Sequence, residues 1–509
     1  MPSADGCVMI MNKKRVQSYR NILHSTAVFG GTQFILTLIN MVKGKLVALL
    51  LGSAGIGLSS LLTNAVGCIQ QIVTLGVNMS VVKEVSQANS EEDRAVLAQI
   101  TKVLRTLLMI SALAGAVLMV VLSPLITRFS VDDSRYGMFF LCLAPVVFFN
   151  VLSSGEYALL QGIRKFKMLA SSSLILGLTS LLVCVPLYYM MGIQGIVPGM
   201  ILTSLISFIS LKWFVSKTEL HTLSLPHVSL KQTLVRGKEI ILLGMVMMLA
   251  GIFGTVANYG IASFISTTGS LQDVGFYHAA NLIVMQCCML VFSAMATDYY
   301  PKLAAAVSEG NVAVCRLVNQ QTEVVLLIIA PVAAWLITVI PALITLLLTS
   351  EFMQAQMLMR YMSLAVIFRS VCFSIDYIAV AKGDKNYYFW LDGVFCNVKM
   401  VLFYMVAYRL WGLDGLGYAI LFSGLIDLMV SMYFSHRRYG FTFLRKFWAL
   451  FSILSTAVVA CFLCSMLRNE WLSYALMISL SLCTTVYCYK QLDKRIDLKS
   501  LLKKKFCKQ

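Results

Sequence analysis

The chain alternates between long apolar stretches and short polar ones along almost its whole length. Apolar blocks recur from Ser25 to Cys488, and each holds the roughly 20 residues that a helix needs to cross a hydrocarbon core of about 30 Å. Because lipid offers no hydrogen-bond partners, the backbone must pair within each block, so every block is predicted to be a helix. The pattern indicates an all-α, polytopic membrane protein.

About 14 transmembrane helices fit this pattern, with ends placed to within about three residues. The predicted spans are 24–51, 56–80, 105–127, 137–160, 168–190, 194–214, 239–266, 274–297, 319–347, 356–381, 387–409, 414–434, 448–467 and 471–489. Composition agrees, because 59% of the residues are hydrophobic and 13% are charged, against about 25% charged in soluble domains. The outward loops are short, so no extracellular domain is expected.

The basic residues assign an orientation to these spans. If the N-terminus is cytoplasmic, and residues within three positions of a span end are counted with the adjoining loop, 32 of the 41 Lys and Arg residues lie on the cytoplasmic side and 4 lie on the outer side. Positive charge gathers on the cytoplasmic side, so both termini are predicted to be cytoplasmic. The bias accounts for the net charge of +18 without nucleic acid as a partner. The basic tail is expected to lie on the anionic inner leaflet.

An internal repeat relates spans 1–6 to spans 7–12. Residues 148–157 (FFNVLSSGEY) resemble 368–377 (FRSVCFSIDY), and 192–196 (GIQGI) resemble 412–416 (GLDGL), both at an offset of 220. A unit of six spans keeps its orientation, so the two lobes are parallel, as in transporters with a pathway between repeats. The predicted regions are a cytoplasmic N-terminus (1–20), an N-lobe (21–230), a C-lobe (231–446), spans 13–14 (447–489) and a cytoplasmic tail (490–509).

Four cations inside the spans are candidate substrate-binding residues. Arg369 and Lys399 lie near the middle of spans 10 and 11, and Lys43 and Lys45 lie in the outer half of span 1. A charge at mid-bilayer costs at least ~2.5–3.5 kcal/mol, so it faces a partner or a water-filled cavity. The cations are not repeated in the other lobe, so we predict that they bind an anionic cargo in a central cavity. Snorkelling of the two lysines to the interface is the alternative.

Four acidic residues are candidates for a coupling or charge network. Asp376 and Asp392 lie seven residues from Arg369 and Lys399, which in an α-helix places each on the same face as its cation; Asp427 lies in span 12. These carboxylates either carry a coupling proton or cation, or form a neutral structural network that joins spans 10–12. Glu156, near the inner end of span 4, joins the network or reaches the surface. Arg360 is expected at the outer interface.

Other chemistry leaves no signature in the sequence. There is no GxxxxGK[ST] loop for nucleotide, no His, Cys and Asp cluster with metal-ligand spacing, and no outward loop large enough to hold an enzyme site. We therefore predict no catalytic residue, no metal and no cofactor, apart from possible coupling to H⁺ or Na⁺.

The first two spans carry a resemblance to a known family. Span 1 ends in a Leu-Gly-x-Ala-Gly-x-Gly turn at 51–57, and span 2 closes with Gly-x-x-x-x-Val-x-Lys at 76–83. Together with the 6+6+2 plan and the short outward loops, this resembles the polysaccharide-repeat-unit flippases of the O-antigen (Wzx) type. That family belongs to the MATE/MOP exporter superfamily, which includes the MATE drug exporters and the lipid II flippase.

The resemblance implies alternating access, without ATP, by two lobes around a central cavity. The cargo would be an undecaprenyl-pyrophosphate-linked oligosaccharide for O-antigen, capsule or a related polysaccharide, moved from the inner to the outer leaflet of the bacterial inner membrane. The implied partners are this cargo, membrane lipids, and a polysaccharide polymerase with its chain-length machinery. Lys43 falls at the place of a functional arginine of the lipid II flippase. That flippase's acidic cation-site residue has only Asn258 near its place, which favours a proton or no coupling ion over sodium.

The mid-membrane cations decide among the functions considered. Lys43, Arg369 and Lys399 suit a pyrophosphate, whereas a MATE-like cation-coupled multidrug exporter, the main alternative, would favour buried carboxylates without a lysine in the first lobe. A membrane polymerase or ligase would need a larger outward loop, and a scaffold or receptor would not explain these cations. The sequence therefore predicts a flippase that is not an enzyme.

Overall fold

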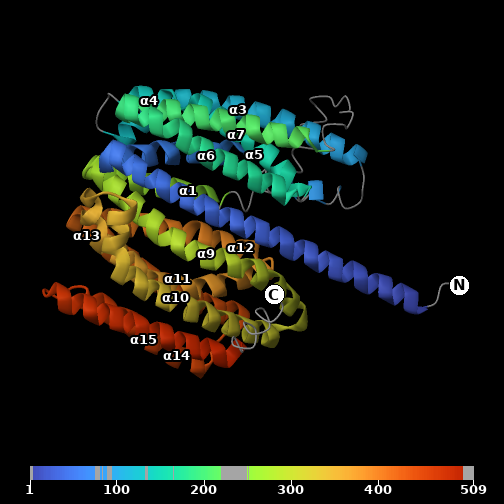
Figure 1. Cartoon of the computed structure of the whole chain (residues 1–509), viewed down its shortest axis with the longest axis vertical. Coiled ribbons are helices and arrows are strands. Elements are labelled where there is room, and N and C mark those ends of the chain that lie inside the picture. The colour runs from blue at the N-terminus through green and yellow to red at the C-terminus, as the bar shows by residue number, and fades with distance from the viewer. Residues whose placement is uncertain are drawn as a thin grey trace. The chain divides into compact units, whose positions relative to one another are not determined.

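The computed structural model describes residues 4–74, 81–82, 84–86, 88, 94–131, 136–163, 165–218, 249 and 251–496. Every regular element in these residues is a helix (Figure 1). Nine helical segments among them are long and apolar enough to cross a membrane. The chain is an integral membrane protein, and the predicted all-α polytopic fold is confirmed.

Three of these nine segments are long enough for two spans each. They are Ile35–Thr74, Lys167–Ser216 and Asn386–Tyr439, with 40, 50 and 54 residues, whereas one span takes about 20. Each contains a glycine with positive φ: Gly52 (65°), Gly192 (56°) and Gly412 (59°). Only glycine adopts this backbone readily, so each is a sharp turn between two helices. The count of fourteen stays a prediction, because residues 75–80 and 219–248 lie outside the described ranges.

The last two of these turns repeat the same close backbone contact. Three residues after Gly192, a Cβ on Gly195 would lie 2.5 Å from the Leu187 carbonyl oxygen. Three residues after Gly412, a Cβ on Gly415 would lie 2.0 Å from the Ala407 carbonyl oxygen. Both contacts are related by the sequence offset of 220, so the shared glycines of the repeat have a steric reason.

The helices group into two compact units. Unit 1 comprises residues 1–51 and 62–248, and unit 2 comprises residues 52–61 and 249–509. The predicted lobe boundary at 230/231 lies outside the described residues, and residues 52–61 group with unit 2 although the repeat places them in the N-lobe. The elements of unit 1 are most of α1 (Ala4–Thr74), α3 (Arg94–Ser130), α4 (Gly137–Leu141), α5 (Ala144–Gly162), α6 (Phe166–Met191), η2 (Gly192–Gly195) and α7 (Ile196–Ser216). Helix α5 packs between α3 and α7, and α6 packs on α7.

Unit 2 is built around α10 and α11. Its elements are helical residues 251–268, α9 (Leu271–Glu309), α10 (Asn311–Leu347), η4 (Ser350–Ala355), α11 (Gln356–Ala381), α12 (Lys385–Tyr388), η5 (Phe389–Phe395), α13 (Cys396–Tyr439), α14 (Arg445–Cys464) and α15 (Glu470–Ile496). Helix α11 packs on α9, α10 and α13, while α14 and α15 pack on α10. The predicted spans 13–14 therefore join the core of unit 2, where the Thr338 and Ser481 hydroxyls are 3.0 Å apart.

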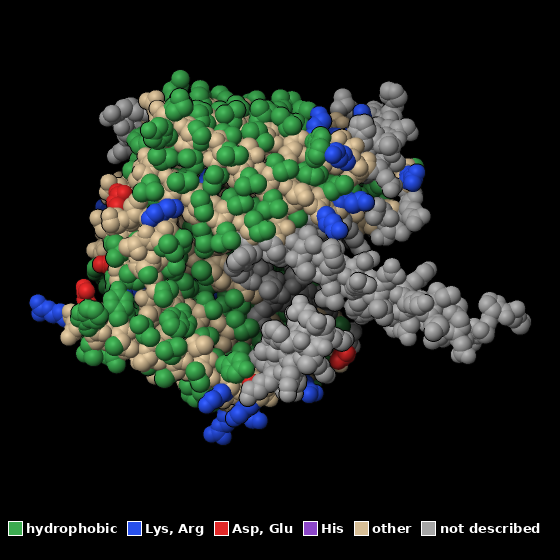
Figure 2. All heavy atoms as spheres, in the orientation of Figure 1, with side chains coloured by type: hydrophobic (Ala, Val, Ile, Leu, Met, Phe, Trp, Pro, Cys, Tyr) green, Lys and Arg blue, Asp and Glu red, His purple; other side chains and the backbone are tan. Residues whose placement is uncertain are grey.

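The outer surface of the helices is strongly apolar. Figure 2 shows hydrophobic side chains over most of one face, with Lys and Arg mainly toward its margins. Leu182, Val121 and Met429 are among the exposed large hydrophobics, at 69%, 64% and 65%. A soluble protein rarely exposes a contiguous apolar patch above a few hundred Å². This surface is that of a lipid-embedded protein.

Candidate functional site

A buried ion pair joins the two arms of α13 in unit 2. Lys399 and Asp427 lie at similar distances before and after the turn at Gly412, so the turn brings them together. The Lys399 ammonium donates to Asp427 Oδ1 and, at 3.0 Å, to the Ser423 carbonyl. Only 6% of the Lys399 side chain is exposed, against 25% for Asp427. The charge of Lys399 is therefore neutralised inside the unit.

Asp392 is not paired with Lys399, although seven residues separate them. Asp392 lies in η5, a π-helical segment, in which hydrogen bonds run from i to i+5 and the α-helical register is lost. The rule that residues seven apart share a face of an α-helix therefore does not apply across this segment. The Asn397 amide supports this segment by donating to the Asp392 and Gly393 carbonyls at 3.0 and 2.8 Å.

Two further carboxylates complete a cluster of charges from the predicted spans 10–12. Ser431 of α13 donates to Asp376 Oδ1 at 2.9 Å, and the charges of Arg369 and Asp427 act on both Asp376 and Asp392. Neither Asp376 nor Asp392 forms an ion pair within the described ranges. We call the whole set the charge cluster: Arg369, Asp376, Asp392, Lys399 and Asp427. No group of three or more His, Cys, Asp or Glu that could hold a metal occurs among the described residues.

Arg369 is the exposed cation of the charge cluster. The N-terminal part of α11, from Leu358 to Ile367, is buried without interruption. Arg369 is exposed, and the open face continues at the half-buried Phe373 and Asp376, one and two turns further along. The guanidinium makes no hydrogen bond to any residue that the structure describes. A cation so placed has its donors free for a ligand or water.

Lys43 is a candidate substrate-binding cation of unit 1, as Arg369 is of unit 2. Its ammonium donates to Ser180 Oγ of α6 at 2.5 Å, and both residues are half-buried. A hydroxyl carries no charge, so this contact does not neutralise the lysine. Lys45 is also half-buried, and two residues further along a helix it points in a different direction.

Glu156 is held by an arginine of the same unit. Arg105 of α3 donates from Nε and Nη2 to the two Glu156 carboxylate oxygens, at 3.0 and 3.2 Å. The Glu156 side chain is 8% exposed and that of Arg105 is 38% exposed. This two-point geometry satisfies the carboxylate and joins α3 to α5. The arrangement favours a structural role for Glu156.

Arg360, which is expected at the outer interface, is buried in unit 2. The residue is 5% exposed, and its guanidinium donates to the Ser465 carbonyl at 3.2 Å, just beyond the C-terminus of α14. Carbonyl groups at a helix C-terminus lack intrahelical partners and attract cations. Arg360 therefore ties α11 to the end of α14.

A second polar contact closes the opposite end of unit 2. Asp384, in the turn between α11 and α12, accepts hydrogen bonds from Arg438, from the Tyr439 hydroxyl at 2.9 Å and from the Tyr387 backbone N–H at 3.2 Å. Burial alone would raise the pKa of Asp384, but these hydrogen bonds hold it below its ordinary value. This contact fastens the α11–α12 turn to the end of α13.

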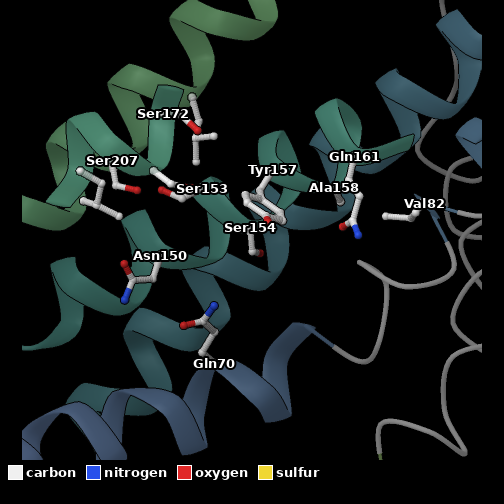
Figure 3. Close-up of a pocket in the computed structure, with 13 residues that line it drawn as sticks. Gln70, Val82, Asn150, Ser153, Ser154, Tyr157, Ala158, Gln161, Ser172 and Ser207 are labelled. Carbon is white, nitrogen blue, oxygen red and sulfur yellow. The ribbon is translucent and has the colours of Figure 1, made fainter. Parts of the chain in front are cut away.

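Unit 1 contains a cavity of about 650 Å³ that was not predicted from the sequence, and nine of its 13 described lining residues have polar side chains. Its lining includes Asn150, Ser153, Ser154, Tyr157 and Gln161 of α5, with further residues from α1, α6 and α7 (Figure 3). A signal for it exists in the sequence, because these five polar residues recur every three or four positions on one face of an apolar helix.

The comparisons with known proteins place the chain in a family. Residues 46–357, more than half of the chain, match the family model described as polysaccharide biosynthesis protein. The chain belongs to this family. The resemblance stated from the motifs of the first two spans is thereby confirmed. No curated protein sequence matches the chain.

Solved structures show which fold this family member has. The lipid II flippase MurJ, in an inward closed conformation, matches with a TM-score of 0.71 and 15% identity over 92% of this chain and 99% of that chain. An inward-facing multidrug resistance MATE transporter of the MOP superfamily matches with a TM-score of 0.66 and 15% identity, over 80% and 94%. A MOP superfamily transporter from Pyrococcus furiosus matches with a TM-score of 0.58 and 15% identity, over 82% and 95%. The chain has the fold of MOP-superfamily transporters.

Proposed function

We propose that the protein moves a lipid-linked oligosaccharide from the inner to the outer leaflet of the bacterial inner membrane during surface-polysaccharide assembly, with both termini in the cytoplasm. One observation carries this proposal: a member of the polysaccharide biosynthesis family has the fold of the lipid II flippase, which it matches over 99% of that protein. The cargo is an oligosaccharide on undecaprenyl pyrophosphate, for O-antigen, capsule or a related polymer. A polymerase and its chain-length machinery would take up the exported unit.

Arg369 and Lys43 are the proposed pyrophosphate ligands. The Arg369 guanidinium offers a fork of donors that matches phosphate oxygens, and it has no hydrogen-bond partner among the described residues. Among the described residues, the one hydrogen-bond partner of Lys43 is a neutral hydroxyl, so its charge is available to a ligand. Lys45 is a further candidate ligand in unit 1. Lys399 is already paired with Asp427, and we assign it a structural role. Transport would proceed by alternating access, without ATP.

Asp376 and Asp392 are the proposed carriers of a coupling proton. Both are half-buried carboxylates within spans and have no ion-pair partner in the part of the chain that the structure describes. An uncompensated carboxylate at membrane depth is costly. Protonation would therefore remove the negative charge of Asp376 and Asp392 before the alternating-access change moves the cluster between the two sides of the membrane. If Asp376→Asn and Asp392→Asn keep the wild-type dependence of transport on a pH gradient, this coupling role is excluded.

The same carboxylates support a second candidate, a MATE-like exporter of cationic drugs. The charge cluster holds three carboxylates and two cations. A cationic cargo would bind Asp376 and Asp392, the two carboxylates that form no ion pair among the described residues. Drug tolerance discriminates the two functions. The flippase proposal expects overexpression to leave tolerance to ethidium and similar cations within twofold of the vector control.

A cell assay tests the flippase proposal directly. Deleting the gene should abolish surface glycan and leave lipid-linked glycan accumulated inside, and the wild-type gene should restore export. Arg369→Gln and Lys43→Gln should each lower surface glycan at least tenfold at unchanged membrane level. The matched control is Arg468→Gln, an exposed arginine in the turn between α14 and α15, which should export normally. Normal export from both Arg369→Gln and Lys43→Gln would rule out these pyrophosphate ligands.

A further inference from the structure

The cavity of unit 1 is lined by polar side chains that the proposed binding of pyrophosphate at Arg369 and Lys43 does not account for. Four helices contribute to it: Gln70 comes from α1, Asn150 from α5, Ser172 from α6 and Ser207 from α7. Figure 3 shows Gln70 extending from α1 toward α5, which carries Asn150 and Tyr157. Its volume of about 650 Å³ lies within the range of about 300–1,000 Å³ for small-molecule sites.

Several side chains in this cavity have no hydrogen-bond partner in the part of the chain that the structure describes. The amides of Gln70, Asn150 and Gln161 make no hydrogen bond to another described residue, and neither does the Ser207 hydroxyl. Asn150 is half-buried and near the middle of predicted span 4. Gln161 is exposed, and Gln70 and Ser207 are half-buried, so these groups are open to hydrogen bonds from water or from a ligand. The cavity is therefore built to receive hydrogen bonds from something that enters it.

The chemistry of the lining selects an uncharged, hydroxyl-rich ligand. None of the 13 described lining residues is charged, which disfavours a phosphate, a metal ion or a cationic drug. Serine hydroxyls and side-chain amides both donate and accept hydrogen bonds, and sugar hydroxyls need both. The Tyr157 ring, 37% exposed, adds an apolar face with a polar tip. An acyl chain would leave the amides unsatisfied.

The repeat supplies an internal comparison. At the offset of 220, Asn150 corresponds to Ser370 and Ser154 to Ser374, on α11 of unit 2. Both of these serines are 0% exposed. An accessible polar face at this place in the repeat therefore occurs on α5 of unit 1 and not on α11 of unit 2. The six-helix fold does not itself require such a face to be accessible.

The cavity and Lys43 lie along one face of α6. Ser173 and Leu176 line the cavity, and Ser180, four residues beyond Leu176, accepts the Lys43 hydrogen bond. Spacings of three and four keep these residues on the same face. Seven residues correspond to roughly 10 Å of helix, so a charged group at Lys43 and a chain of sugars in the cavity are within reach of one another.

We propose that this cavity binds uncharged sugar residues of the cargo through their hydroxyl groups, while the pyrophosphate lies at Lys43 on the same face of α6. The inference rests on the proposed flippase function and adds where its sugar part is recognised. Because a site built to hydrogen-bond hydroxyls rejects ligands that lack them, this cavity would set which glycan is accepted.

Cysteine protection tests the inference in the full-length protein. Ser207→Cys places a thiol in the cavity, and its maleimide modification is measured in membrane vesicles after subtracting the labelling of the parent protein. Two strains supply the probes. One strain makes the host's own lipid-linked glycan, and the other lacks the first sugar transferase and so contains undecaprenyl phosphate without sugar. Modification should slow at least threefold only in the strain that makes the glycan. The matched control is Ser216→Cys, an exposed position at the C-terminal end of α7 and just beyond the predicted span 194–214, which should label equally in both strains.

Export assays complete the test. The double variant Gln70→Leu/Asn150→Leu should lower surface glycan at least tenfold, whereas Thr203→Val, a helix-bonded hydroxyl of α7 that is not among the lining residues, should not.

Equal labelling of Ser207→Cys in both strains, or slowing by the carrier lipid alone, would overturn the inference. So would normal export by the double variant while Arg369→Gln abolishes export. If the flippase function itself were wrong, the deletion strain would keep its surface glycan. If the double variant does not accumulate, the protection measurement decides.

Discussion

The buried pair of Lys399 and Asp427 gives the sharpest prediction about stability. Changing Lys399 to Met keeps the aliphatic stem but removes the ammonium, which leaves Asp427 without its cation and the Ser423 carbonyl without its donor. Breaking a buried pair by removing one partner costs about 3–5 kcal/mol. Asp427 is 25% exposed, so water recovers part of this cost and we expect about 3 kcal/mol.

The assay is thermal unfolding of the purified protein in detergent, followed by intrinsic fluorescence at one fixed scan rate. For a unit of this size, 1 kcal/mol corresponds to about 2 °C, so Lys399→Met should lower the Tm by roughly 6 °C. Arg495→Met is the matched control in the same unit. It breaks a more exposed pair with Glu323, with side chains 30% and 15% exposed, and should cost under about 1 kcal/mol.

A double variant separates the pair from other effects of the substitution. Replacing both members by apolar residues often restores stability, so Lys399→Met/Asp427→Leu should recover most of the lost Tm and at least half of wild-type glycan export. A shift below about 2 °C for Lys399→Met, equal to the control, would refute the reasoning. So would a double variant no more stable than the single one. Restored stability with no export would instead return Lys399 to the substrate site.

Three further changes test other contacts of the two units. Glu156→Gln removes the charge that receives two hydrogen bonds from Arg105 and should cost about 2–3 kcal/mol, read as a lower Tm. Asp384→Asn tests pH dependence: because the pKa of Asp384 is held below its ordinary value, its stabilisation is complete above the pKa of the unfolded chain and is lost as pH falls through the folded pKa. The drop of Tm below about pH 4 should therefore be smaller in Asp384→Asn than in wild type. Gly57→Ala places a Cβ 1.9 Å from the Leu271 carbonyl oxygen, so we expect a cost of at least about 1–3 kcal/mol and reduced protein level on immunoblots.

The fold was largely predictable because lipid constrains the backbone so strongly. Apolar blocks in a membrane must be helices. The glycines at 192 and 412, which the repeat relates, indicated the turns that the structure contains. The glycine-rich end of span 1 was also visible in the sequence. Its packing was not, because the close contacts of Gly57 with Leu271 and of Gly275 with Ser53 depend on two helices far apart in sequence.

The partners of the charged residues were much harder to predict. Periodicity assumes a continuous α-helix, and the π-helical segment around Asp392 breaks that assumption. Lys399 instead meets Asp427 across a turn, which spacing along one helix cannot reveal. The cavity of unit 1 was hard to predict for a different reason, because its serines and amides are individually common in membrane helices. Their recurrence on one face of α5 was the usable signal.

Translocation by the purified protein tests the central claim most directly. Proteoliposomes would carry the host's radiolabelled undecaprenyl-pyrophosphate-linked oligosaccharide in both leaflets, and an impermeant glycosidase added outside would report the accessible fraction. With wild-type protein the account predicts that nearly all the lipid becomes cleavable over time, whereas Arg369→Gln protein and empty liposomes stay near one half. A wild-type protein that leaves the inner half protected, with and without an imposed pH gradient, would contradict the account.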